Sequence, residues 1–234
     1  MTEIVIPDGG TIGSASDPDA ISIASSGKPT FSQGIANTGT IDAGTLGSSV
    51  VVPASIGGSI HLIQKQSGPI SLIEFTNLSN HSAFRHLMFI FDNVFPSGNN
   101  VTLRSRIATS GTSYLDASYH HVANLIERNQ SNGVGAEFIH ATTSTQFIAI
   151  ENVGNASDDQ GPCGEATLYN HQISTAYKRI IYSIAWSDQG AYDKLQLGFA
   201  HYKGNKDAFT AIKFEFSSGT IASGSISMYG IKDA

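Results

Sequence analysis

Two segments of the sequence carry side chains that could bind a carbohydrate. They read SGTSYLDASY over residues 110–119 and WSDQGAYDK over residues 186–194. An aromatic ring offers its flat apolar face to a sugar, and a neighbouring carboxylate or amide hydrogen-bonds to the hydroxyls. The candidate ligand-binding residues are therefore Tyr114, Asp116, Tyr119, Trp186, Asp188, Tyr192 and Asp193.

Both segments also have a structural interpretation. Trp186 ends the apolar segment RIIYSIAW, so its ring could cap the hydrophobic core instead of facing a ligand. The same alternative applies to Tyr114 and Tyr119. Burial decides between the two interpretations, and burial depends on the fold.

The spacing of histidines, acidic residues and cysteine does not favour metal or thiol chemistry. His120 and His121 are adjacent, and neighbours on a strand point to opposite faces, so they would not easily share one metal ion. The acidic segment NASDDQGPCGE, residues 155–165, lacks the spacing of a calcium-binding EF-hand loop. Cys163 has no Cys/His/Asn signature around it, so we expect an unreactive thiol, no metal and no cofactor.

Catalytic motifs are also missing from the sequence. It contains no Gly-x-Ser-x-Gly nucleophile elbow, so serine hydrolase chemistry is not supported. A carboxylate pair for glycoside cleavage is defined by distance in space, so a polysaccharide-cleaving enzyme stays open as a remote alternative. We expect a protein that is not an enzyme.

The composition limits the classes of partner. Of 234 residues, 40% are apolar and only 14% are charged, with a net charge of −6, whereas about 25% charged is typical. The low charge suggests that other subunits cover part of the surface; a neutral, Ser/Thr/Asn-rich surface is the alternative.

The 13 Lys and Arg residues are scattered, which argues against nucleic acid. We also expect no membrane insertion, no signal peptide and, with one cysteine, no internal disulfide.

The first quarter of the chain differs from the rest. Residues 1–33 are dense in Gly, Ser, Asp and Pro and could not fold alone, so they are expected to form an arm. Residues 34–58 place apolar side chains at intervals of six, five, five and five, which favours a chain that turns back on itself every five or six residues, or short strands wound about a three-fold axis. An ordinary linker is the alternative. The expected trimer or shaft residues are Ile35, Ile41, Leu46, Val51 and Ile56.

Residues 59–234 read as about a dozen short strands separated by Gly, Asn, Asp and Ser. The segment VTLRSRIA alternates, with Val101 and Ile107 on one face. In the last strand, Ile226 and Met228 should face the core, with Ser225 and Ser227 outward. The sequence predicts an all-β fold, an antiparallel jelly-roll-like β-sandwich with an extended N-terminal arm.

Three stretches resemble bacteriophage virion proteins. Residues 91–122, FDNVFPSGNNVTLRSRIATSGTSYLDASYHHV, are similar to a recurrent stretch in which an Asn-Val-x-Pro strand end precedes a Leu-x-x-Arg strand and a Gly-x-Ser-Tyr turn. Residues 211–232, AIKFEFSSGTIASGSISMYGIK, resemble the ending of tail-fibre β-sandwich domains. Most of residues 1–33 resembles the opening module of marine and freshwater phage fibres.

The resemblance implies a virion protein of the tail-fibre or head-fibre type, assembled in the host cytoplasm. The leading expectation is a short homotrimeric fibre that attaches to other virion proteins through residues 1–33 and binds a host surface glycan with residues 59–234. A capsid decoration or head-fibre (cement) protein without a receptor role is the alternative.

Overall fold

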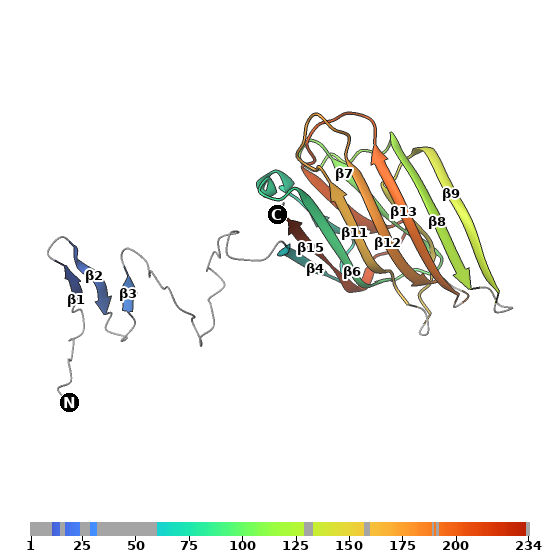
Figure 1. The fold of residues 1–234 in the computed structure, drawn as a ribbon. Coiled ribbons are helices and arrows are strands. Elements are labelled where there is room, and N and C mark those ends of the chain that lie inside the picture. Colours follow the sequence, from blue (N-terminus) through green and yellow to red (C-terminus); the bar gives the residue numbers. More distant parts are fainter. Residues whose placement is uncertain are drawn as a thin grey trace. The chain divides into compact units, whose positions relative to one another are not determined.

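A computed structural model of the chain describes residues 11–14, 17–23, 29–31, 60–128, 133–156, 160–188, 190 and 192–232. The chain divides into two compact units, Met1–Val51 and Val52–Ala234. In the first unit, β1 (Thr11–Ser14), β2 (Asp17–Ile23) and β3 (Pro29–Phe31) form a three-stranded antiparallel sheet (Figure 1). The expected shaft stripe, Ile35, Ile41, Leu46, Val51 and Ile56, lies outside the described residues.

The second unit is a β-sandwich of two antiparallel sheets, as the sequence predicted. One sheet has eight strands in the order β4 (Ile60–Ser67), β15 (Ile221–Ile231), β6 (His86–Pro96), β11 (Cys163–Tyr169), β12 (Arg179–Ser187), β13 (Asp193–Tyr202), β8 (Tyr119–Arg128) and β9 (Val134–Ser144). The other has four, in the order β10 (Ile148–Val153), β7 (Val101–Ala108), β14 (Ala211–Phe216) and β5 (Ile73–Phe75). A single 3-10 turn, η1 (Leu78–His81), is the helical element of the described residues.

Three pairs of consecutive strands, β4 with β5, β6 with β7 and β14 with β15, each place one strand in each sheet. The pairs have the same neighbours in both sheets. The order β4-β15-β6 in the large sheet is matched by β5-β14-β7 in the small one. Each pair therefore passes from one sheet to the other around the core. The last pair, β14 and β15, lies between the first two pairs in both sheets. This is the connectivity of a jelly roll, and it explains why a C-terminal strand can complete the fold.

The core fills the space between the sheets, and strand alternation selects its members. On β7 the predicted face is buried, from Val101 to Ile107. The rings of Phe75, Phe89 and Phe91 all pack against Phe214, with centroids 5.2 to 6.4 Å apart. Such tilted and edge-to-face contacts stabilise aromatic pairs beyond the area they bury.

The last strand follows its predicted alternation. Ile226 and Met228 are fully buried in the core. Ser225 and Ser227 fall on the opposite face, where neighbouring strands cover them almost completely. Between Ser223 and Ser225 the register with β6 shifts, and Gly224 has a φ of +85°. An added Cβ at Gly224 would overlap the carbonyl oxygen of Asn93, so only glycine fits this irregularity.

Loops at one end of the sandwich are joined by a buried lysine. The Lys178 ammonium donates hydrogen bonds to the carbonyl oxygens of Ile173 (2.6 Å), Ala176 (3.1 Å) and Lys206. Burial lowers the Lys178 pKa. The amine thereby ties the β11–β12 loop to the β13–β14 loop. His171, in the first of these loops, is also fully buried.

We predict that Gly224→Ala lowers the free energy of unfolding by about 3 kcal/mol or more, because strain at positive φ adds to the overlap with Asn93. Gly111→Ala is the matched control: its φ is +52°, but an added Cβ meets nothing within 4 Å. That change should cost only about 1 kcal/mol. Urea titration of both variants measures the difference, and equal losses would contradict the steric explanation.

We also predict that stability decreases as the pH falls from 6.5 to 4. Burial lowers the pKa of His171 from 6.5 to about 4. Between these pH values the unfolded chain binds a proton at His171 and the folded protein does not, so acid favours unfolding. The loss attributable to His171 is about 3 kcal/mol at most. Thermal unfolding across this range should show a shallower pH dependence for His171→Phe, and an unchanged slope would contradict the assignment.

Candidate functional site

Two of the seven candidate ligand-binding residues belong to the core. Trp186 is 3% exposed and packs within the sandwich, in agreement with the structural interpretation of this residue. Tyr119 is fully buried; its hydroxyl accepts a hydrogen bond from the Ile107 amide (3.2 Å) and donates one to the Leu115 carbonyl (3.0 Å). Both rings are therefore almost completely covered by the protein itself.

Asp188 organises its own loop. Its carboxylate accepts hydrogen bonds from the amides of Gly190 (2.8 Å) and Tyr192 (3.2 Å) and lies 3.0 Å from the Lys194 ammonium. Lys194 also lies 3.2 Å from Glu127. Burial lowers the Lys194 pKa, but the two carboxylates outweigh it and the net shift is upward. The ion pair therefore fixes the loop that carries Tyr192.

The remaining candidates are more accessible. Tyr114 is partly buried; its hydroxyl donates to Glu74 (2.6 Å) and the Lys213 ammonium lies 4.8 Å from its ring centroid. Burial, reinforced by Glu74, raises the Tyr114 pKa. Asp116 is exposed and Tyr192 is partly exposed, while exposed Asp193 pairs with Arg128 at 3.3 Å.

The two candidate loops lie at opposite ends of the sandwich. In the β8–β13 ladder, Tyr119 pairs with Tyr202 at one end and Glu127 with Lys194 at the other. The 110–119 loop precedes β8, and the 186–194 loop precedes β13. They therefore cannot form one binding site.

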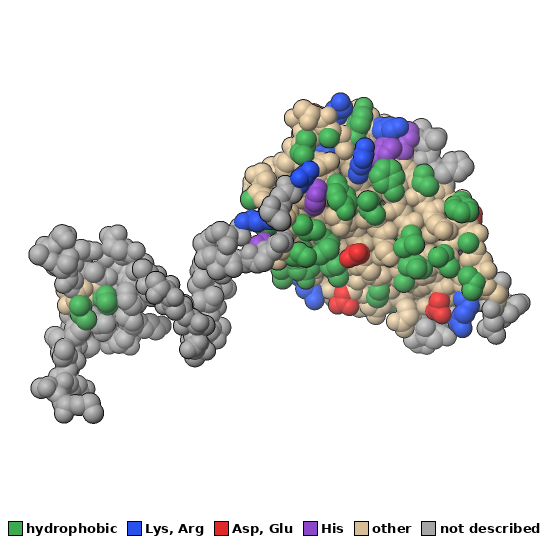
Figure 2. Space-filling model, viewed as in Figure 1, with side chains coloured by type: hydrophobic (Ala, Val, Ile, Leu, Met, Phe, Trp, Pro, Cys, Tyr) green, Lys and Arg blue, Asp and Glu red, His purple; other side chains and the backbone are tan. Residues whose placement is uncertain are grey.

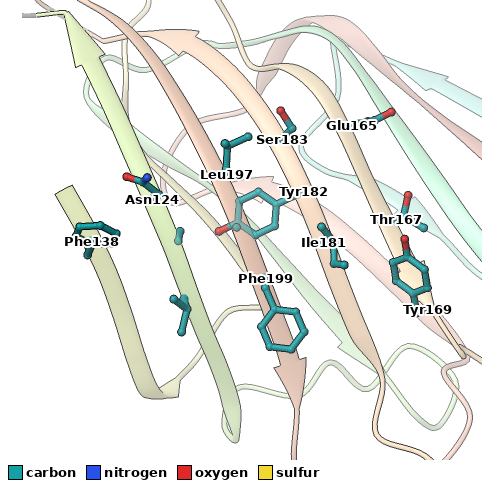
Figure 3. Close-up of a pocket in the computed structure, with 13 residues that line it drawn as sticks. Asn124, Phe138, Glu165, Thr167, Tyr169, Ile181, Tyr182, Ser183, Leu197 and Phe199 are labelled. Carbon is teal, nitrogen blue, oxygen red and sulfur yellow. The ribbon is translucent and has the colours of Figure 1, made fainter. Parts of the chain in front are cut away.

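A broad hollow of the described surface lies on neither loop but on the outer face of the eight-stranded sheet. This outer trough encloses about 610 Å³ and crosses β8, β9, β11, β12 and β13. Figure 2 shows apolar side chains gathered over these strands, and Figure 3 shows how they stand on the sheet. The outer trough is lined on this face by Val122, Asn124, Phe138, Glu165, Thr167, Tyr169, Ile181, Ser183, Leu197 and Phe199.

Apolar side chains in the outer trough are well exposed. Val122 is 57% exposed, Phe138 80%, Ile181 51% and Leu197 44%. Glu165 is the only charged side chain among the lining residues. Thr167, Ser183 and Asn124 add neutral polar groups. Exposed apolar patches of this kind mark interaction surfaces more often than catalytic centres.

Sequence reasoning missed this surface, although a signal was present. The alternation of apolar residues identified the core face of each strand and assigned the other face to solvent. In β12, however, the segment RIIYSIAW is nearly continuous in apolar residues. Such runs are typical of strands covered on both faces.

The outer face of the four-stranded sheet is different, because it carries charges. Glu215 lies 3.2 Å from Arg104, 3.9 Å from Arg106 and 2.9 Å from Lys213. Glu74 lies on the neighbouring strand β5 and accepts a hydrogen bond from the Tyr114 hydroxyl. The two outer faces thus differ in chemistry, and the large sheet has the apolar one.

A second, polar hollow of about 320 Å³ includes Glu127, Glu137, Glu151, Trp186 and Lys194 in its lining. Glu127 is engaged with Lys194. Within the described part of the chain, no group of three His, Cys, Asp or Glu side chains is placed to hold a metal ion. No helix in that part is long and apolar enough to span a membrane.

Comparisons with protein-family models, with curated proteins and with solved structures found no match for this chain.

We predict that Asp188→Asn lowers the free energy of unfolding by about 3 kcal/mol, because Lys194 loses a partner while it stays buried. Asp193→Asn is the matched control five residues further along the same loop. Its ion pair with Arg128 is exposed, so the loss should stay below about 1 kcal/mol. Equal losses in chemical denaturation would show that Asp188 does not organise the loop.

Proposed function

We propose that the chain is a structural protein of a bacteriophage particle, a short trimeric fibre that attaches through residues 1–33 and turns its sandwich toward the host. The observation that carries the proposal is the outer trough, a broad apolar surface with one carboxylate, suited to binding rather than to catalysis. The division into an N-terminal unit and a separate sandwich agrees with an attachment arm followed by a displayed domain. The resemblance of residues 91–122 and 211–232 to virion proteins supplies the biological setting.

The register of the large sheet shows at which end the chain enters the sandwich. Ile60, the first residue of β4, pairs with Ile231, and the ladder continues from there through His86, Tyr169 and Arg179 to His201. These pairs all lie at the end where β8 begins with Tyr119. The chain therefore enters the sandwich at the end that carries the 110–119 loop.

The opposite end carries the 186–194 loop. It is the end of the sandwich farther from chain entry at Ile60, and we propose that it is the end displayed to the host. We therefore assign the host glycan contact to Tyr192 and Asp193, which are at least partly exposed and stand on a loop held by Asp188. A weak contact is sufficient, because several copies on one particle raise the effective concentration of the second binding event.

We predict that particles carrying Tyr192→Ala adsorb to host cells more slowly, by about tenfold, because stacking on the ring is lost. Tyr114→Ala is the control, since it removes a partly buried ring from the other end of the sandwich. The measurement is the rate at which free particles disappear after mixing with cells. Normal adsorption of the Tyr192→Ala particles would exclude this loop as the receptor contact.

Antibody labelling of intact particles tests the proposed position. Label at the tail vertex supports the fibre, whereas label across the shell supports the decoration alternative. Release of reducing ends from host polysaccharide by the purified protein would instead support the enzyme alternative.

A further inference from the structure

We infer that the outer trough is a subunit interface, occupied in the assembled protein by a second copy of this chain. The inference rests on the proposed function in one respect, since a trimeric fibre requires contacts between copies. It adds the surface at which those contacts are made and the side chains that make them.

The apolar surface extends beyond the outer trough along the same face. A neighbouring hollow of about 310 Å³ has Ile126, Val134, Ala185 and Leu195 in its lining. Register places these residues outward beside the trough: Ile126 pairs with Leu195, and Leu195 with Ala185. The patch therefore continues over β12, β13, β8 and β9 toward the end of the sheet that carries the 186–194 loop.

The dimensions of the patch suit a protein partner. Five strands at about 4.8 Å spacing span about 24 Å, and the four strands other than the seven-residue β11 have nine or more residues and span about 30 Å. The area is on the order of 700 Å², close to the roughly 800 Å² that each partner contributes to a stable interface. A small ligand would leave most of this surface in contact with water.

The chemistry of the patch favours a copy of the chain over a glycan. Aliphatic side chains and the rings of Phe138, Tyr169 and Phe199 outnumber the polar groups in the lining, so few partners are available for the hydroxyls of a sugar. Charges lie at its margin, with the Arg128–Asp193 pair at one end and exposed Arg179 at the other. An apolar centre within a charged rim is the anatomy of a subunit interface.

The edge of the sheet supports the same partner. β9 ends the eight-stranded sheet, and its outward Val134 and Phe138 are the most exposed large apolar side chains of the described residues, at 77% and 80%. An uncovered apolar edge strand invites association with other chains. A neighbouring copy seated on the outer trough would cover both side chains. The low charge of the whole sequence, 14%, also agrees with a surface that is partly covered.

The test is the mass of the full chain in solution, measured by light scattering after size-exclusion chromatography. The wild-type protein should have three times the 24.7 kDa mass of one chain. Ile181→Glu combined with Leu197→Glu places two charges at the centre of the trough and should reduce the species to a single chain. Ile173→Glu is the matched control, because Ile173 is also exposed but lies in the β11–β12 loop, and it should keep the wild-type mass.

A thiol cross-link provides a second readout that requires no charge in the trough. In a Cys163→Ser background, Ser183→Cys places a thiol in the outer trough, and a short bismaleimide should join two chains. Ser218→Cys, exposed beyond β14, should not be joined.

A wild-type trimer that survives the double substitution, with no cross-link at residue 183, would overturn the outer trough as the interface but leave the trimeric fibre intact. A monomeric wild-type protein at micromolar concentration would overturn both. The position of the protein on the particle is measured separately by antibody labelling, so failure of the virion assignment is distinguishable from failure of the interface.

Discussion

The sandwich depends on one mismatch: an eight-stranded sheet is packed against a sheet of four strands. Where the two overlap, aromatic rings such as Phe75, Phe89 and Phe214 fill the space between them. The small sheet ends at β10, and the strands β8 and β9 close the large sheet on one side. The buried Lys194 and its carboxylate partners, Asp188 and Glu127, are in this region, where ion pairs replace apolar packing.

The same mismatch separates the two outer faces. The small sheet carries the Glu215 cluster of ion pairs on its outer face. The large sheet turns aliphatic side chains outward and has nothing in the described chain to cover them. Because burial of apolar area is the main source of association energy, a partner gains far more from the large sheet than from the small one.

The jelly-roll connectivity also separates the ends of the sandwich. Chain entry at Ile60 and the loop around Tyr114 share one end, whereas the loop held by Asp188 occupies the other. The two outer sheet faces and the loop held by Asp188 are therefore separate surfaces of the sandwich.

The sequence by itself determined the fold class, the alternation that buries Val101, Ile107, Ile226 and Met228, and the absence of long helices among the described residues, because these follow from local periodicity. It could not decide whether Trp186, Tyr119 and Asp188 bind a ligand or are buried, because these side chains suit a binding loop as well as a core. Only the tertiary structure decided that these three are buried and that the two candidate loops lie at opposite ends of one ladder. The outer trough likewise exists only because pairing brings five strands, from β11 to β9, side by side. Strand order is a non-local property, and a pattern within one strand carries no information about its neighbours.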